Sequence, residues 1–357
     1  NMRAGKLIPL WDLFRFDETS WDQPTIFNIE FIADNAVRYR YEIAVDGMEV
    51  LKECLSCIKE GKETSLIERM LPLNNESLSH GGRIENRDII TVFKNLLLLS
   101  KFGKDTPNEI ITPAYLYLAN LQVVFAEETF TNRMGEIVAK VDGSKAYAFA
   151  LNEILSAADT GLVGLASSKL FPDLGVPGNV LEELKKYMEN YPQQLFGFHN
   201  VIGEKKTRSL PFIEESNGTQ HLCMIAGIIL QALKQGRTIF IDEIDMSLHT
   251  HVIKMLIQLF QSKELNKKHA QLIMTTHNTN LLDYTLFRKD QIWFAEKNEE
   301  GSSELFSLQD FADVAEDTPF DKWYLAGKFG ATPNIKDMPS LVGALIHYLR
   351  DEEATAD

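Results

Sequence analysis

The sequence predicts an α/β protein with a mainly parallel sheet, an N-terminal antiparallel hairpin and a helical insertion. Three features of the 357 residues support this class. Apolar and polar residues alternate over residues 24–47, as is typical of strands. The spacing becomes helical from about residue 51 to residue 191, and short apolar runs follow residue 198. We therefore expect four segments, at residues 1–50, 51–200, 201–320 and 321–357.

The hairpin is expected around a turn at Asp34 and Asn35. Phe27, Ile29 and Phe31 alternate with polar residues before this turn, and a similar alternation follows it from residue 37 to residue 43. Two alternating runs joined by a short polar turn are typical of an antiparallel hairpin.

The middle of the chain is expected to be helical. Pairs of apolar residues recur between Ile89 and Leu97, and a long apolar stretch runs from Leu116 to Phe125. Residues 74–87 are polar and contain glycine, which predicts a loop.

The later part of the chain predicts parallel strands joined by helices. Thr238–Ile241 and Gln271–Met274 are short apolar runs, as in strands buried on both faces, and a third such strand is expected at residues 291–295. Helices are expected over residues 219–233 and 251–260. Ligands of such sheets bind beyond the carboxyl ends of the strands.

Composition excludes several classes of protein. A formal net charge of −15 argues against broad, non-specific binding of nucleic acid. The sequence has no run of eighteen uncharged apolar residues, so we expect no membrane span. Cys54 and Cys57 form a C-x-x-C pair, but no second pair of zinc ligands follows it. Three cysteines suggest a reducing compartment, and we expect the protein to be cytoplasmic.

Two carboxylates follow the first of the apolar runs. Hydrolysis of a nucleoside triphosphate needs one acid that holds Mg²⁺ and another that orients and deprotonates the attacking water. Asp242 suits the first role and Glu243 the second. Taken alone, acidic residues also follow buried strands simply because the chain enters solvent there.

A histidine follows the next apolar run, in the segment Thr275-Thr276-His277-Asn278. An imidazole at this strand end could donate a hydrogen bond to a γ-phosphate. By itself His277 would be read as a surface histidine. Its place one helix and one strand after Asp242 and Glu243 favours the functional interpretation.

The segment Glu215-Ser216-Asn217-Gly218-Thr219 precedes the apolar helix expected from residue 219. A helix start presents hydroxyl and backbone N–H groups to an anion. Ser216 or Asn217 also suits an ordinary N-cap, and the two interpretations are compatible.

In this order the three motifs resemble the small prokaryotic ABC-type AAA ATPases, relatives of the OLD-family and SMC-like ATPases. Residues 215–219 resemble the signature loop, Asp242-Glu243 the Walker B motif, Ser247-Leu248-His249 the D-loop, and His277 the switch histidine. The resemblance covers residues 12–50 and 209–335. Further matching segments are Phe14–Asp17, Tyr39–Tyr41, Arg288–Phe294, Gly301–Leu305 and Tyr324–Ala331.

The resemblance implies ATP and Mg²⁺ as ligands, with Asp242 at the metal and Glu243 and His277 as catalytic residues. Ser216, Asn217, Gly218, Thr219 and His249 would contact the nucleotide. It also implies a homodimer or higher homo-oligomer with ATP clamped between subunits, and a role in anti-phage defence. A nuclease or other effector would then be a separate chain, and the sequence leaves ATP and GTP as alternatives.

The sequence departs from the family at two places. Thr250 stands where these families usually have proline. More importantly, no G-x-x-x-x-G-K-[ST] loop occurs, and that loop supplies the phosphate cradle. We expect the printed sequence to begin just downstream of it, so that this chain alone has little or no ATPase activity. The alternative is a pseudo-ATPase that serves as a scaffold or sensor; a DNA-binding module has no basic run to support it.

Overall fold

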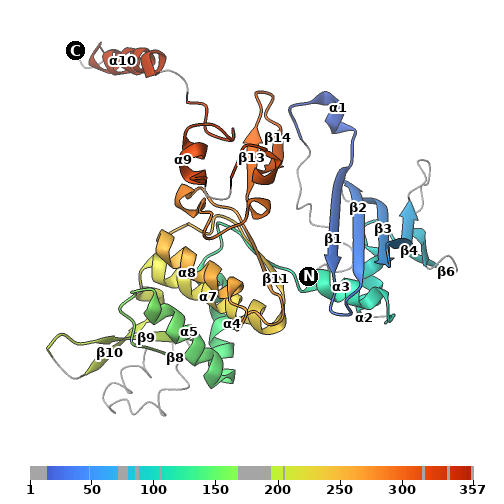
Figure 1. The fold of residues 1–357 in the computed structure, drawn as a ribbon, viewed down its shortest axis with the longest axis horizontal. Coiled ribbons are helices and arrows are strands. Elements are labelled where there is room, and N and C mark those ends of the chain that lie inside the picture. Colours follow the sequence, from blue (N-terminus) through green and yellow to red (C-terminus); the bar gives the residue numbers. More distant parts are fainter. Residues whose placement is uncertain are drawn as a thin grey trace. The chain divides into compact units, whose positions relative to one another are not determined.

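The computed structural model describes residues 14–47, 49–70, 79–84, 88–104, 106–167, 194–203, 206–315, 318–335 and 338–354 (Figure 1). The predicted Gly-containing loop at residues 74–87 lies partly outside these residues, and its described part, Ser79–Ile84, is a strand and not a loop. The chain divides into two compact units, Asn1–His277 and Asn278–Asp357. We describe each unit by itself.

A six-stranded antiparallel sheet opens the first unit, with its strands in chain order. They are β1 (Thr25–Ile32), β2 (Arg38–Asp46), β3 (Glu49–Lys59), β4 (Lys62–Met70), β5 (Ser79–Ile84) and β6 (Asp88–Phe93). The helix α1 (Glu18–Trp21) precedes β1, and its first turn is capped by the Asp17 carboxylate. The predicted hairpin is confirmed, since β1 and β2 pair antiparallel from Thr25↔Val45 to Ile32↔Arg38.

One face of this sheet packs on the segment that follows it, formed by η1 (Leu98–Ser100), α2 (Lys101–Lys104) and α3 (Ile111–Ala119). Alternation turns Phe31, Tyr39 and Leu55 toward these elements. The ring of Tyr117 on α3 stacks on Phe31 with centroids 4.4 Å apart. The core of this region therefore lies between the sheet and α3.

A buried ionic pair also ties the sheet to η1. Glu53 accepts hydrogen bonds from the Leu98 and Leu99 backbone N–H groups at 2.6 and 2.9 Å. The fully buried guanidinium of Arg69 lies 3.7 Å from the Glu53 carboxylate. Burial raises the pKa of the Glu53 carboxyl, although these hydrogen bonds oppose the shift, and burial lowers the pKa of Arg69.

The remainder of the first unit contains two smaller sheets. A parallel sheet has the order β12–β11–β7, and an antiparallel sheet has the order β10–β9–β8. Their strands are β7 (Gln122–Val124), β8 (Gly164–Ser167), β9 (Leu195–Asn200), β10 (Thr207–Pro211), β11 (Thr238–Ile241) and β12 (Gln271–Met274). The helices are α4 (Phe130–Gly143), α5 (Lys145–Ala157), α7 (Asn217–Gln235) and α8 (Thr250–Gln261), with the 3₁₀ turn η3 (Phe212–Glu214) before α7. Figure 1 shows α7 and α8 beside β11.

Helix α7 is long because its sequence is apolar and both ends are well capped. The Ser216 side chain accepts a hydrogen bond at its start, and Gly236 ends it in a left-handed conformation with φ +73°. Ten of its residues are buried, including Leu222, Met224 and Ile229. The predicted helices over residues 219–233 and 251–260 are confirmed as α7 and α8.

The second unit contains the antiparallel pair β13 (Trp293–Lys297) and β14 (Ser303–Ser307). Its helical elements are η4 (Thr279–Leu281), η5 (Lys289–Gln291), η6 (Leu308–Asp310), α9 (Phe320–Leu325) and α10 (Met338–Ala354). An aromatic core holds it together, in which the Phe294 ring stacks on Tyr324 and Phe329, each with centroids 5.5 Å apart.

Several sequence predictions are wrong in detail. The region expected to be helical from residue 51 begins with strands, because β3, β4 and β6 pair into the first sheet. The stretch from Leu116 to Phe125 contains the end of α3 and then β7. Residues 291–295 do not extend the parallel sheet, since β13 pairs antiparallel with β14.

The α/β class itself is confirmed, but the sheet is not mainly parallel. Among the described residues, parallel pairing is confined to β12–β11–β7. No described helix combines the length and the hydropathy that crossing a membrane requires.

Candidate active site at the ends of β11 and β12

The two strands that precede the candidate residues end side by side. Strands β11 and β12 pair in parallel from Thr238↔Gln271 to Ile241↔Met274. Asp242 follows β11 and Thr275 follows β12, so both lie at the same edge of the sheet. The Asp242 backbone N–H donates to the Val124 carbonyl of β7 at 2.9 Å, which anchors the start of the loop on its other side.

Thr275 joins the two carboxylate-bearing residues. Its hydroxyl donates to Asp242 Oδ1 at 2.5 Å and accepts from the Glu243 backbone N–H at 2.8 Å. The Ile244 backbone N–H donates to the Thr275 carbonyl at 3.1 Å. Thr275, which directly follows β12, therefore forms hydrogen bonds with three consecutive residues after β11: Asp242, Glu243 and Ile244.

Glu243 and His277 face each other, as the sequence predicts. His277 Nε2 lies 3.7 Å from Glu243 Oε1, and 87% and 42% of the two side chains are exposed. Glu243 has φ +47°, a conformation that costs free energy for a residue other than glycine and that clusters at functional sites. The carboxylate and the imidazole are therefore both accessible to a ligand at this edge.

Asp245 is a member of this cluster that the sequence analysis missed. Its Oδ1 accepts a hydrogen bond from the Thr276 hydroxyl at 2.6 Å and another from the His277 backbone N–H at 3.3 Å. The only available signal in the sequence was an acidic residue three positions after Asp242, and turns after strands often contain one.

Ser216 caps α7, as one of the two sequence interpretations predicts. Its Oγ accepts from the Thr219 backbone N–H at 3.1 Å and lies 2.9 Å from the Thr219 hydroxyl. Ser216 and Asn217 are exposed, whereas Thr219 is only 7% exposed because its side chain turns back to the cap. The Thr219 side chain is therefore not at the surface, although the resemblance implies that Thr219 contacts the nucleotide.

Gly218 contacts the loop that follows β11. A Cβ added to Gly218 would lie 2.9 Å from the Ser247 carbonyl oxygen. Ser247 itself has φ +61°. The start of α7 and the loop of Glu243 thus meet through Gly218 and Ser247, while the hydrogen bonds of Ser216 that the structure shows stay within its own helical turn.

Glu215 and His249 have structural partners. The Glu215 carboxylate is nearly buried and accepts a hydrogen bond of 2.8 Å from Nε2 of His199 on β9. His249 is the N-cap of α8, and its Nδ1 accepts from the His251 backbone N–H at 3.3 Å. The His249 side chain is exposed, and its predicted contact with a nucleotide stays a prediction.

A sequence profile of the family described as "AAA domain, putative AbiEii toxin, Type IV TA system" matches residues 6–283. This match covers more than half of the chain and includes every candidate residue above. The chain belongs to this AAA family.

Other comparisons add little to this assignment. A comparison with curated proteins gives no match. Among solved structures, the AAA protein is similar to an SMC head domain from Thermotoga maritima, with 14% identity over 77% of each chain and a TM-score of 0.31. At this TM-score the similarity does not bear on fold or function.

The AAA domain has one carboxylate suited to a metal. Among the described residues, no group of three or more His, Cys, Asp or Glu side chains could hold an ion. Mg²⁺ is commonly bound by one or two carboxylates together with water and substrate phosphates. The exposed Asp242 carboxylate, with one oxygen oriented by Thr275, fits that mode of binding.

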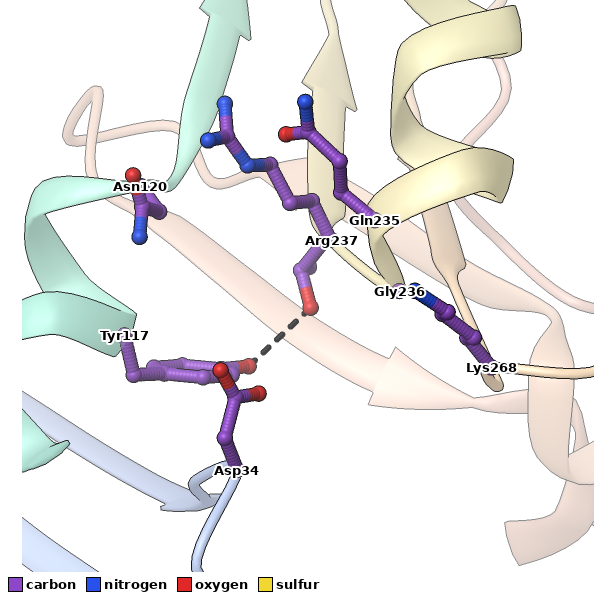
Figure 2. A pocket seen from close by; sticks show the side chains of 8 residues that line it. Asp34, Tyr117, Asn120, Gln235, Gly236, Arg237 and Lys268 are labelled. Carbon is purple, nitrogen blue, oxygen red and sulfur yellow. Dashed lines mark hydrogen bonds between the residues drawn. The ribbon is translucent and has the colours of Figure 1, made fainter.

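A pocket of about 250 Å³ lies at the opposite, amino end of β11 (Figure 2). It is lined by Asp34, Tyr117, Asn120, Gln235, Gly236, Arg237, Thr238 and Lys268. The Tyr117 hydroxyl lies 3.0 Å from Thr238 Oγ1 on its floor. Because none of these residues belongs to the predicted motifs, the pocket of this AAA domain is separate from the candidate active site.

Proposed function

We propose that this protein binds and hydrolyses ATP as an ABC-type ATPase and contributes the half-site formed by Asp242, Glu243 and His277. The observation that carries the proposal is the 3.7 Å approach of His277 to Glu243 beside Asp242, at the ends of two neighbouring parallel strands. Phosphoryl transfer to water uses an acid that holds Mg²⁺ and a group that orients the attacking water.

The proposed roles follow from the chemistry of each group. Asp242 would hold Mg²⁺, which supplies positive charge to the phosphate oxygens when bound. Glu243 would orient the attacking water and accept its proton. His277, at the adjacent strand end, would donate a hydrogen bond to the terminal phosphate. The accessible side chains of Glu243 and His277 support these roles.

A second half-site is proposed at the start of α7. Ser216, Asn217 and Gly218 would face the nucleotide of another subunit, so that ATP clamps a homodimer. The exposed N-cap of a nineteen-residue helix supports this role because its backbone N–H groups and dipole favour a phosphate. Thr219 would act indirectly, through its bonds to Ser216, and His249 would border the same interface.

The biological setting is a proposal from the family description. The family is described by a putative toxin of a type IV toxin–antitoxin system, which fits a role in defence. We propose a role in anti-phage defence in the cytoplasm, with a separate effector chain as partner.

The alternative is a pseudo-ATPase that binds partner proteins. One observation favours it: the printed sequence contains no G-x-x-x-x-G-K-[ST] loop. Without that loop, the phosphate cradle and its lysine must come from elsewhere.

The test measures ATP hydrolysis by the 357-residue chain and, if the gene encodes a phosphate loop upstream of it, by the longer product. We expect Mg²⁺-dependent hydrolysis by a gene product that contains the phosphate loop, and little or none by the chain alone. Glu243→Gln should abolish turnover and accumulate an ATP-dependent dimer in analytical ultracentrifugation, whereas Glu264→Gln, at an exposed position after α8, should change neither. A gene product that lacks turnover and does not dimerise with ATP would support the scaffold instead.

A further inference from the structure

Asp245 belongs to none of the motifs identified in the sequence, but it makes two hydrogen bonds in the candidate active site. Its carboxylate holds both the Thr276 hydroxyl and the His277 backbone N–H. Asp245 does not touch the imidazole of His277, so its effect on that ring must pass through the backbone of β12's end.

The loop that carries Asp245 is also in contact with α7. The Leu248 backbone N–H donates to the Asp245 carbonyl at 3.3 Å, which closes a turn around Ser247. Ser247 has φ +61°, and its carbonyl lies against Gly218, where an added Cβ would be only 2.9 Å away. The turn therefore links two contacts: Asp245 binds the His277 backbone N–H, and Ser247 lies against Gly218.

We propose that Asp245 is a positioning residue that holds His277 opposite Glu243 and, through the turn at Ser247, couples His277 to Gly218 at the start of α7. The two half-sites of one protomer would then not move independently. A displacement of His277 would be transmitted to α7 because Asp245, which binds His277, and Ser247, which lies against Gly218, belong to the same four-residue turn. The left-handed conformation of Ser247 leaves that turn few alternative conformations. This inference rests on the proposed function, because that function explains why the two half-sites would be coupled. The contacts of Asp245, Ser247 and Gly218 do not depend on it.

The test uses the full chain without nucleotide, so its outcome is independent of whether the protein hydrolyses ATP. Amide-resolved hydrogen exchange and the NMR signals of the His277 ring report how firmly this residue is held. Asp245→Ala removes the oxygen that accepts both hydrogen bonds and should speed exchange of the His277 amide about tenfold. Asp245→Asn keeps an acceptor oxygen and should restore exchange to within about twofold of the native rate, a rescue that a loss of general stability would not give.

Two further variants keep the test decisive if Asp245→Ala folds poorly. Thr276→Val removes one of the two hydrogen bonds to Asp245 and should give an intermediate exchange rate. Asp313→Ala, at an exposed position of the second unit, is the control and should leave the His277 signals unchanged.

The coupling to α7 is tested with a second substitution. Gly218→Ala should push the Ser247 carbonyl and shift the His277 ring signals in the native background. The shift should be smaller in Thr276→Val, which keeps the hydrogen bond from the His277 backbone N–H to Asp245, and absent in Asp245→Ala. Gly143→Ala, where an added Cβ meets nothing within 4 Å, is the matched control. The proposal is overturned if Asp245→Ala leaves His277 exchange unchanged, if Asp245→Asn behaves like Asp245→Ala, or if Gly218→Ala acts equally in all three backgrounds.

Discussion

The hydroxyl of Thr275 donates a hydrogen bond to Asp242 across the ends of two parallel strands, at 2.5 Å. The same oxygen accepts the Glu243 backbone N–H. Thr275→Val keeps the shape of the side chain but leaves the Glu243 N–H without this acceptor. We expect a loss of about 1–2 kcal/mol in the free energy of unfolding, measured by urea denaturation. Thr275→Ser retains the hydroxyl and should be close to the native protein; equal stability of the Val and Ser variants would contradict the prediction.

Substitutions of the buried pair Glu53 and Arg69 should have strongly non-additive effects on the free energy of unfolding. The guanidinium and the carboxylate lie 3.7 Å apart. Arg69→Met leaves the buried Glu53 carboxylate without its cation, and Glu53→Leu leaves the buried guanidinium without its anion. Each single change should cost about 3–5 kcal/mol, and the double variant should cost clearly less than their sum. Additive losses in urea denaturation would show that the two side chains stabilise the sheet separately.

Acid should destabilise the protein in part through His221 on α7. Burial lowers the pKa of His221 from its ordinary value of 6.5, and its Nε2 has no hydrogen-bond partner in the described structure. The folded state therefore binds this proton less readily than the unfolded chain, so stability is present above pH 6.5 and is lost as the pH falls below it.

The variant His221→Gln tests this relation. Its free energy of unfolding should depend less on pH between 7.5 and 5.5, by at most about 1.4 kcal/mol per pH unit. The exposed His251 supplies the control, since His251→Gln should retain the native pH dependence. If both variants have the same slope, His221 is not the group responsible.

The glycine that ends α7 should be hard to replace. Gly236 has φ +73°, and a Cβ there would lie 2.7 Å from the Lys268 backbone carbonyl oxygen. Gly61 has a similar φ of +78° but nothing within 4 Å of an added Cβ. Gly61→Ala should cost about 1 kcal/mol for its backbone conformation, and Gly236→Ala about 1–2 kcal/mol more for the clash. Equal unfolding midpoints for the two variants would contradict this ordering.

Local patterns predicted the elements whose partners lie close in the sequence. The alternation around Asp34 correctly predicted β1 and β2, and the apolar runs before Asp242 and Thr275 correctly predicted β11 and β12. Strand β6 was mistaken for a helix because paired apolar residues such as Ile89-Ile90 suit either structure until a partner strand is known. Strand β7 has three residues, too few for any period to be detected.

The candidate site was predictable to a similar extent. Asp242, Glu243 and His277 could be found because each follows a strand directly, and parallel strands end at a common edge. Asp245 and Thr275 could not, since their importance lies in hydrogen bonds between two loops more than thirty positions apart. The burial of Thr219 could not be predicted either, because its hydrogen bond to Ser216 cannot be inferred from composition.

The central place of β11 in the parallel sheet affects how the protein is made. Its partners are β7, which leaves the ribosome more than a hundred residues earlier, and β12, which follows about thirty residues later. Until residue 274 has been synthesised, Val123 and its neighbours have no complete sheet to join, although the β1–β6 sheet can already pair within itself. Slow translation between residues 125 and 275 would therefore prolong the time in which this nascent chain exposes unpaired strand edges to chaperones.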